Sequence, residues 1–447
     1  MIAQDEAAKI LEKVLLLKTA SDMRVRLGGG EESLTRFAND EITQNLAISD
    51  VTLVIEAAFG KRIAQASTNM LDDKSLKEVV GRAELLARAS KVNPEYMPSL
   101  PPQEYEKIEA HFPETADFGP RQRAERIKEV VEPFVRRGLI TSGTFANGEA
   151  FRAIATSFGL FAYHKWTSSE FSITARTADG SGASRASQSD VRRIGDLDTG
   201  ALGDEARKRA LASQNPTELP PGDYTVVLEP EAVAELLSFL FTSFDARSAD
   251  EGRSFMSDRP KGETCKGRKT GGNKLGQKIV GENIQIRSQP GHSLILARPF
   301  SSDGLAAREI TWIEKGVAKN LSYSRYWAKE KNKEPSGPPT SLVMEGGEES
   351  IEDLIKSTQR GVLVTRLWYI RFVDPNEILL TGLTRDGTFL IENGEITRPI
   401  KNFRFNESPV TLLQNVERMT APKKVANSVV PAVKAHNFTF TSISSAV

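Results

Sequence analysis

The chain has 447 residues, of which 39% are hydrophobic and 26% charged, close to an ordinary soluble globular protein. That composition excludes a wholly disordered or fibrous chain, and the length predicts two or three domains at ~150 residues each. Fifty-nine Lys and Arg residues balance 59 Asp and Glu residues, so the net charge is zero. Proteins that cover a nucleic acid backbone usually carry a basic excess, and a dedicated DNA-binding protein is therefore disfavoured.

The number of cysteines and the hydropathy pattern indicate in which cellular compartment to expect the protein. Cys265 is the only cysteine, so an intramolecular disulfide is impossible and a reducing compartment is favoured. Residues 1–18 place charged residues among apolar ones at helical spacing, which predicts an amphipathic helix rather than a secretory signal. No run of ~18 uncharged apolar residues occurs. We expect a cytoplasmic protein that does not span a membrane.

The first half alternates apolar and polar residues in short runs that predict strands, at residues 23–27, 33–37, 41–47, 51–59, 62–67 and several within 140–177. Gly28-Gly29-Gly30 is interpreted as a turn, and Gly60-Lys61 as the turn of a hairpin. Apolar residues at spacings of three and four predict a helix that has Asp72 or Asp73 as N-cap and apolar positions from Leu76 to Ala87, and further helices at 121–137 and 203–214. The proline and glycine cluster at 215–222 predicts a domain boundary, with domains at 1–218 and 219–447.

The second half begins with a strand at 224–228 and a helix at 230–246, with Pro230 at its first position. The remaining third is strand-rich, and Asn393-Gly394 is a strong hairpin signal. Thr384-Arg385-Asp386-Gly387 is interpreted as a turn with a local ion pair. The predicted fold is α+β, with an antiparallel sheet and helices in the N-terminal domain and a β-rich, mostly antiparallel C-terminal domain that also carries helices.

Catalytic motifs of the common kinds are absent from the sequence. The four histidines, His111, His164, His292 and His436, lie dozens of residues apart, so no pair can share one helical turn. A metal site assembled from scattered residues stays open. The chain has no G-x-S-x-G nucleophile elbow. The basic loop at 257–278, which contains Cys265, does not match a phosphate-binding loop, and either a solvated insertion or a contact with an anionic partner is compatible with it.

An aromatic and basic run, Arg366-Leu-Trp368-Tyr369-Ile-Arg371, stands out in the last third. On a regular strand, Arg366, Trp368 and Ile370 would face one side and the other three residues the opposite side. Amphipathic aromatics beside arginines often line a binding groove. Ordinary sheet packing with the arginine head groups in solvent is an equally good interpretation.

Several segments, in collinear order, resemble the TldD/PmbA family, also described as modulators of DNA gyrase or as TldD/TldE metallopeptidases. The N-terminal segments are Ser33-Leu-Thr-Arg-Phe-Ala-Asn-Asp-Glu-Ile, Gly60-Lys-Arg-Ile-Ala-Gln-Ala-Ser-Thr-Asn and Leu85-Leu-Ala-Arg-Ala-Ser. The C-terminal ones are Glu314-Lys-Gly-Val, Gly361-Val-Leu-Val and Phe389-Leu-Ile-Glu-Asn-Gly-Glu-Ile-Thr-Arg-Pro. Each segment alone is weakly specific, but the ordered set spans most of the chain.

The resemblance implies where a zinc site would lie. TldD-type members carry a His-Glu-x-x-x-His helix after a strand, and a later cysteine, which together bind the catalytic zinc. The equivalent positions here fall near Leu237, Ser238 and Thr242, in a segment without histidine or glutamate, and no cysteine follows Cys265. Zinc catalysis needs three protein ligands and an open position. We therefore expect no catalytic residue, no metal ligand and no cofactor in this chain, as in the PmbA/TldE-type members.

The resemblance also implies a role. PmbA/TldE-type members assemble with a zinc-bearing TldD-type subunit into a cytoplasmic protease that processes unfolded or modified peptides. We expect this chain to pair with such a subunit or with itself, and to contribute Trp368, Tyr369, Arg371, Arg385 and Asp386 as walls of a peptide cleft. Two alternatives stay open: a hydrolase with a relocated site, and a regulatory binding protein of the gyrase-modulator type. Direct binding to nucleic acid is the weakest interpretation of a neutral chain.

Overall fold

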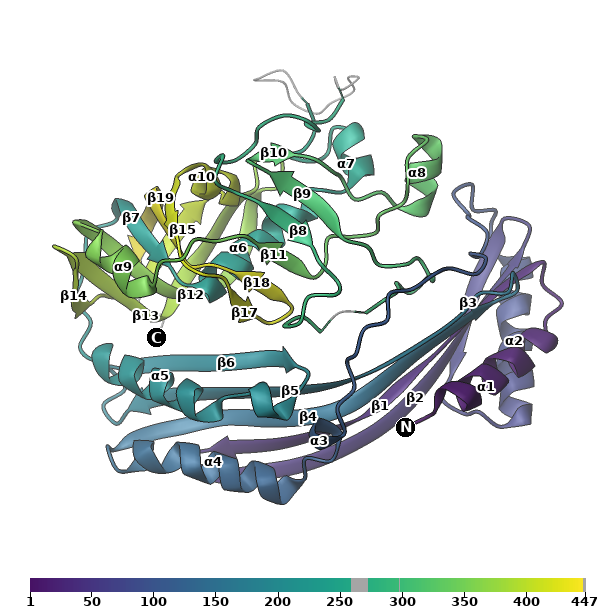
Figure 1. Cartoon of the computed structure of the whole chain (residues 1–447), viewed down its shortest axis with the longest axis horizontal. Coiled ribbons are helices and arrows are strands. Elements are labelled where there is room, and N and C mark those ends of the chain that lie inside the picture. Colours follow the sequence, from purple (N-terminus) through teal and green to yellow (C-terminus); the bar gives the residue numbers. More distant parts are fainter. Residues whose placement is uncertain (259–271, 297, 445–447) are drawn as a thin grey trace.

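The computed structural model describes residues 1–258, 272–296 and 298–444, and it confirms the predicted α+β fold. A long antiparallel sheet of six strands, in the order β3-β2-β1-β4-β5-β6, lies beneath the C-terminal half of the chain (Figure 1). Its strands are β1 (Asp22–Ala38), β2 (Glu41–Phe59), β3 (Arg62–Thr68), β4 (Leu139–Thr156), β5 (Phe161–Thr177) and β6 (Ala183–Val191).

The strands of this sheet are longer than the sequence pattern indicated. The interpretation of Gly28-Gly29-Gly30 as a turn is wrong, because all three lie inside β1. A Cβ atom on Gly29 would lie 2.4 Å from the carbonyl oxygen of Asp50, and one on Gly30 would lie 2.3 Å from that of Glu149. Glycine is therefore required here for the close approach of β1 to its two neighbours, rather than for a reversal of the chain.

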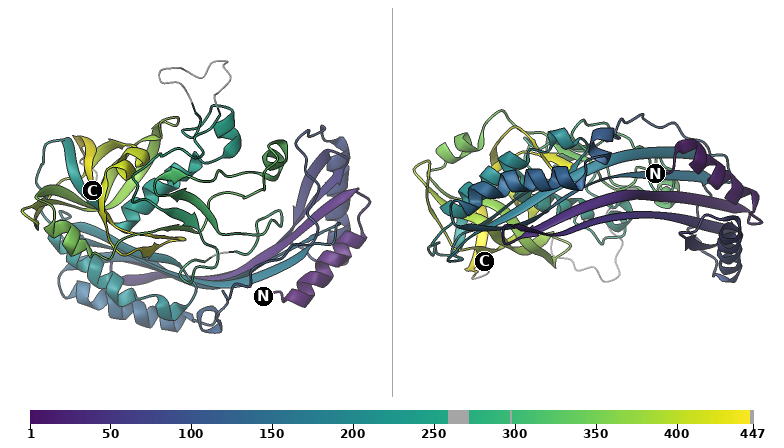
Figure 2. Two further views of the ribbon diagram at one scale, coloured as in Figure 1. Left: turned by 45° about the horizontal axis from the view of Figure 1, so that its top comes forward. Right: turned by 90° about the horizontal axis from the view of Figure 1, so that it is seen from below.

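Four helices cover one face of the sheet: α1 (Gln4–Leu16), α2 (Asp73–Ala89), α4 (Pro120–Val135) and α5 (Thr199–Ala212). The odd-numbered side chains of β1, including Val25, Leu27 and Phe37, point toward these helices and are buried. Figure 2 shows α1 and α2 near one end of the sheet and α4 and α5 near the other. A short helix α3 (Pro113–Ala116) precedes α4. The even-numbered side chains consequently face the C-terminal half.

In the C-terminal half, five strands close into a ring, since β12 pairs with both β7 and β13. The ring consists of β7 (Gly222–Leu228), β12 (Arg360–Asp374), β13 (Leu379–Glu392), β15 (Phe403–Glu407) and β19 (Val433–Ile443). Only the β7–β12 pairing is parallel in this ring. Two further strands pair with strands of the ring: β14 (Glu395–Pro399) pairs with β13, and β16 (Val416–Met419) pairs with β19. The hairpin predicted at Asn393-Gly394 joins β13 and β14.

A second C-terminal sheet has the order β10-β9-β8-β11-β18-β17. Its strands are β8 (Ile286–Ser288), β9 (Ile310–Glu314), β10 (Val317–Ala318), β11 (Leu342–Met344), β17 (Lys423–Val425) and β18 (Ser428–Val430). The helices of this half are α6 (Pro230–Thr242), α7 (Ala246–Asp250), α8 (Arg325–Glu330), α9 (Ile351–Lys356) and α10 (Pro409–Gln414). Among the described residues, no helix is long and apolar enough to cross a bilayer.

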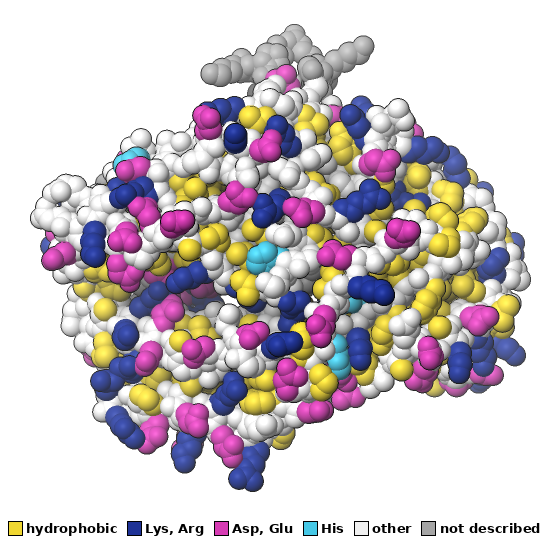
Figure 3. Space-filling view, viewed as in Figure 1, with side chains coloured by type: hydrophobic (Ala, Val, Ile, Leu, Met, Phe, Trp, Pro, Cys, Tyr) yellow, Lys and Arg dark blue, Asp and Glu magenta, His cyan; other side chains and the backbone are white. Residues whose placement is uncertain are grey.

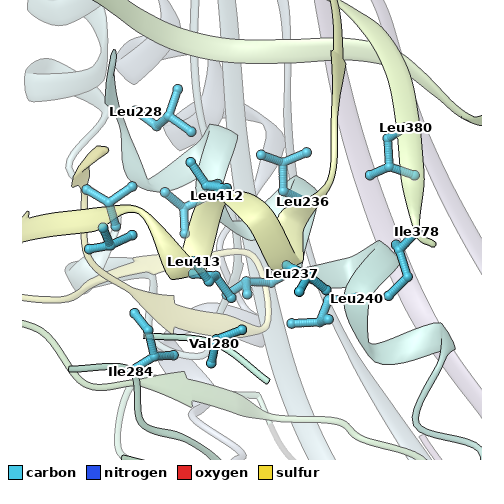
Figure 4. Close-up of a cluster of buried hydrophobic side chains, with 14 of the residues drawn as sticks. Leu228, Leu236, Leu237, Leu240, Val280, Ile284, Ile378, Leu380, Leu412 and Leu413 are labelled. Atoms are coloured by element: carbon cyan, nitrogen blue, oxygen red, sulfur yellow. The ribbon is translucent and has the colours of Figure 1, made fainter. Parts of the chain in front are cut away.

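Helix α6 runs through the main C-terminal core. It begins at Pro230 as predicted but ends at Thr242, and the expected continuation to residue 246 is wrong because a separate helix α7 starts there. Asp245 caps α7 by accepting a hydrogen bond from the backbone N–H of Ser248 at 2.8 Å. Figure 4 shows Leu236, Leu237 and Leu240 of α6 within the cluster that also contains Leu412 and Leu413 of α10.

Three register shifts disturb the pairing of β12 with β13, and the first two bear on the predicted residues. The turn expected at Thr384–Gly387 is wrong, because β13 continues through it and absorbs an extra residue at Asp386, whose φ is +60°. A second extra residue lies on β12 at Tyr369, with a φ of +56°. The expected alternation of Leu367 and Ile370 between two faces is also wrong, since both are buried. A bulge shifts the side-chain period by one residue, and the sequence period does not reveal it.

Candidate functional site

The five predicted cleft residues lie together beside the bulges at Tyr369 of β12 and Asp386 of β13. The ring of Trp368 lies 5.5 Å from that of Tyr369, measured between centroids. The guanidinium of Arg385 lies 4.1 Å from the Trp368 ring centroid, and that of Arg371 lies 4.3 Å from the Tyr369 ring centroid. Asp386 lies 3.8 Å from Arg385, between Oδ1 and Nε. Two aromatic rings covered by two cations therefore form one surface cluster, which we call the aromatic–arginine cluster.

This cluster contains a strained residue. Tyr369 is 58% exposed, so no burial of its ring holds the backbone in the left-handed region. A left-handed conformation of a bulky residue costs about 1–3 kcal/mol. The flanking pairs of β12 with β13 impose it, and the result is that Trp368 and Tyr369 both project toward solvent instead of alternating. Strain of this kind is typical of functional sites.

Helix α6 forms the neighbouring wall. The ring of Phe239 lies 5.2 Å from that of Phe372 of β12, in an edge-on arrangement. Glu235 Oε2 accepts a hydrogen bond from the backbone N–H of Leu367 at 3.1 Å. The helix that the resemblance assigns to the zinc motif is thus in direct contact with the strand that carries the predicted cleft residues.

The three positions assigned to a degenerate zinc motif have ordinary structural roles. Leu237 is buried in the core cluster of Figure 4. Ser238 and Thr242 are exposed, and their hydroxyls donate hydrogen bonds of 2.7 Å to the backbone carbonyls of Glu235 and Phe239 in the same helix. Neither a leucine nor a hydroxyl turned back onto its own helix suits zinc, which prefers Cys, His and carboxylate ligands. These residues do not fit a zinc ion.

Two of the four histidines pair with carboxylates outside this cluster. His111 Nε2 lies 2.7 Å from Glu149 Oε2, and His436 Nε2 lies 3.0 Å from Glu417 Oε2. In the parts of the chain that the structure describes, no three His, Cys, Asp or Glu side chains form a group that could hold a metal ion. Most of the basic loop predicted at 257–278, with Cys265, falls in residues 259–271, outside the described residues.

A charged network behind the aromatic–arginine cluster was not predicted. Arg366 Nη1 donates to Asp386 Oδ2 at 2.7 Å, and its Nε lies 3.5 Å from Glu231 Oε1 and 3.8 Å from Glu235 Oε1. The Arg366 side chain is 19% exposed and that of Asp386 is 10% exposed. Three carboxyl groups therefore surround one half-buried guanidinium, which we call the Arg366 network. Glu231 and Glu235 are the two charged residues of α6 and are spaced i,i+4, and this spacing was the available sequence signal.

Burial shifts the titration of this network. It raises the pKa of Glu235 to about 8, because desolvation penalises the carboxylate and outweighs the opposing charge of Arg366, and the nearby Glu231 adds to the rise. Desolvation also raises the pKa of Glu231. At the start of α6, burial raises the pKa of Glu229 to about 7, although Arg209 of α5 holds it with hydrogen bonds of 2.5 and 2.7 Å.

We expect the Glu235→Gln variant to change the pH dependence of stability. A carboxyl group with a raised folded-state pKa binds more protons when folded, so its stabilising contribution is complete below about pH 4.5 and declines as pH rises toward 8. Because about a third of this side chain is exposed, we expect a decline of about 2 kcal/mol, less than the full shift would give. Urea unfolding between pH 5 and 9 should show a flatter profile for the variant, which keeps an acceptor for Leu367. Parallel profiles for the two proteins would contradict this assignment.

Comparisons with known proteins decide the family. Residues 98–214 match the family model described as the PmbA/TldA metallopeptidase central domain, and residues 221–442 match the one described as its C-terminal domain. Together these matches cover most of the chain. The chain belongs to the PmbA/TldD family. The resemblance found in the sequence is thereby confirmed.

Solved structures of this family share the fold over nearly the whole chain. TldE from Thermococcus kodakarensis is 19% identical, with a TM-score of 0.85 over 97% of this chain and 99% of that one. A protein described as a candidate modulator of a DNA gyrase, from Thermotoga maritima, is 17% identical, with a TM-score of 0.84 over 97% of this chain and all of that one. A similarly described protein from Bacteroides thetaiotaomicron is 21% identical, with a TM-score of 0.84 over 99% of this chain and all of that one.

One curated relative of the PmbA/TldD chain is a metalloprotease from Methanothermobacter thermautotrophicus, 27% identical over 161 residues. That match covers 32% of this chain and 34% of the relative, so the chain spans about a third of that relative's length. The comparisons thus establish that the chain is a metallopeptidase-like protein of the PmbA/TldD family.

Proposed function

We propose that this chain is a non-catalytic, TldE-like subunit of a cytoplasmic protease complex that processes peptides. The observation that carries the proposal is α6: its exposed face presents Ser238 and Thr242, with hydroxyls bonded to the helix backbone, where a zinc-bearing subunit of the family would present histidines. No histidine in the chain is followed by glutamate. Zinc and the water that it activates would then belong to a TldD-type partner, whereas a pairing of this chain with itself would be inactive.

The aromatic–arginine cluster supplies the peptide-binding part of this proposal. Beyond Val364, no strand among the described residues pairs with β12 on its β7 side, although α6 contacts β12 at Leu367 and Phe372. An extended peptide can add to an unpaired strand edge through main-chain hydrogen bonds, and neighbouring pockets then select its side chains. Trp368 and Tyr369 would contact the peptide, with Arg371, Arg385 and Asp386 holding their rings in place.

Two other functions have weaker support. For a hydrolase with a relocated site, the carboxyl groups beside the aromatic–arginine cluster are Glu231 and Glu235, and both are engaged with Arg366. A role as a gyrase modulator rests on the printed description of two matched structures. Figure 3 shows Lys and Arg side chains mixed with Asp and Glu over the visible face, without the one-signed field that DNA binding favours.

The test is reconstitution with a zinc-bearing TldD-type chain from the same organism. We expect the two chains to elute together in gel filtration and to cleave an unstructured peptide only when combined. Trp368→Ala combined with Tyr369→Ala should lower cleavage at least about tenfold while the chains still elute together, since stacking aromatics dominate such contacts. Phe158→Ala removes a comparably exposed aromatic from the β4–β5 turn and serves as the control. Failure to co-elute, or cleavage by this chain alone, would contradict the proposal.

A further inference from the structure

The face of the N-terminal sheet that lies away from the helices contains a basic hollow of about 370 Å³. Arg26 of β1 and Arg152 of β4 line it, and Arg298 reaches it from the C-terminal half. The register places Arg152 directly opposite Gly28, two residues from Arg26 on the same face. Side chains at such diagonal positions are near neighbours. Because Gly28 has no side chain, the space between the two arginines stays open.

Trp166 of β5 forms the wall next to this hollow. It pairs with Ala150 across the β4–β5 ladder, which puts it diagonal to Arg152 on the same face. The guanidinium of Arg298 lies 4.7 Å from the Trp166 ring centroid. Three cationic side chains thus converge on one hollow, one of them oriented by a cation–π contact.

These three arginines form no direct ion pair among the described residues, although Glu56 and Asp303 act on Arg26, and Asp190 acts on Arg298, from further away. Arg24 forms an ion pair of 2.6 Å with Glu56, but among the described residues no ion pair involves Arg26, Arg152 or Arg298. The buried Nε of Arg26 also has no hydrogen-bond partner. Burial lowers the pKa of Arg152, and the charges of Arg298 and Arg26 lower it further. Half-buried cations without a direct ion pair are costly, and an anion bound in the hollow would offset that cost.

The hollow continues along the same face into a second one of about 380 Å³, and Ala150 lines both. Glu32, Asp50 and Glu170 line this second hollow, so the groove is basic at one end and acidic at the other. From Gly28 to Glu32 along β1 is about 13 Å, the length of roughly four extended residues. A short peptide has this polarity, with a carboxylate at one end and an ammonium group at the other.

We propose that Arg26, Arg152 and Arg298 bind the C-terminal carboxylate of a short extended peptide lying in this groove. The choice of a peptide as the source of the carboxylate rests on the proposed function. The guanidinium fork matches a carboxylate with two parallel hydrogen bonds, and charge assistance strengthens them. Inorganic phosphate offers the same oxyanion chemistry, so an experiment has to separate the two sources.

Calorimetric titration of the full chain with tetra-alanine, its C-terminal amide and inorganic phosphate makes that separation. We expect the free acid to bind at least about tenfold more tightly than the amide and than phosphate. Arg152→Gln should weaken binding of the free acid at least about tenfold, whereas Arg36→Gln, exposed ten residues further along β1 than Arg26, should leave it within about twofold. The melting temperature of Arg152→Gln should not fall, because a repulsive charge is removed.

Equal binding of acid and amide, tighter binding of phosphate, or no binding of any probe would overturn the assignment. A variant Arg152→Gln with unchanged affinity would overturn it as well. The experiment uses this chain without a partner, so its outcome is independent of complex formation. A chain that binds tetra-alanine through these arginines but never assembles with a zinc-bearing subunit would contradict the proposed function alone.

Discussion

Replacing Arg366 with methionine is expected to lower the free energy of unfolding by about 3–5 kcal/mol at pH 8. The variant leaves the carboxyl groups of Glu231, Glu235 and Asp386 near one another without their shared cation. Truncating one partner of a buried ion pair costs far more than the pair contributes in net terms, because the remaining charges stay desolvated. The loss should shrink as the pH falls, because Glu231 and Glu235, whose pKa values burial raises, then take up protons.

Urea unfolding at pH 5 and pH 8 measures this effect. Arg404→Met is the matched control, because Arg404 is exposed on β15 and, among the described residues, forms no ion pair. A surface substitution of this kind should change stability by no more than about 0.5 kcal/mol. A loss below about 1 kcal/mol for Arg366→Met, or a loss that does not depend on pH, would mean that Arg366 does not neutralise these three carboxyl groups.

The Leu237→Ala variant is expected to cost about 2–5 kcal/mol of stability, because the side chain fills space between α6 and α10 in the core of Figure 4. Ser238→Ala, one position along the helix, should change stability by less than about 0.5 kcal/mol, since its hydroxyl only returns to a helix carbonyl. Thermal unfolding of both variants checks the contrast. Equal effects, or a larger effect at Ser238, would mean that this turn of α6 has a role other than core packing.

Local patterns in the sequence predicted most elements but not their lengths. Pro230 and the apolar spacing after it predicted the start of α6, and Asn393-Gly394 predicted a hairpin. Both predictions were correct because these signals act within a few residues. The interpretation of Gly28-Gly29-Gly30 as a turn was wrong because the glycines allow β2 and β4 to approach β1 closely. These strands become neighbours only through tertiary pairing. The same limit applies to the bulge at Tyr369, which depends on the register of β13.

The residues of the candidate site were likewise predictable from the sequence only in part. The five residues predicted to line a cleft could be chosen because aromatics and arginines cluster within two short segments, and the structure brings those segments together. The Arg366 network joins α6 to β12 across more than a hundred residues of sequence. The arginines of the basic hollow come from β1, β4 and the C-terminal half. Charges assembled in this way become visible only when the sheet register is known. The division into domains at residues 1–218 and 219–447 stays a prediction.

The most direct test of the proposed function is the zinc content of the purified chain, measured together with cleavage of an unstructured peptide with and without added zinc. We predict far less than one zinc per chain and no cleavage under either condition, because α6 offers a leucine and two hydroxyls bonded to the helix where ligands would be needed. About one zinc per chain, with cleavage that a chelator abolishes, would contradict the proposal of a non-catalytic subunit.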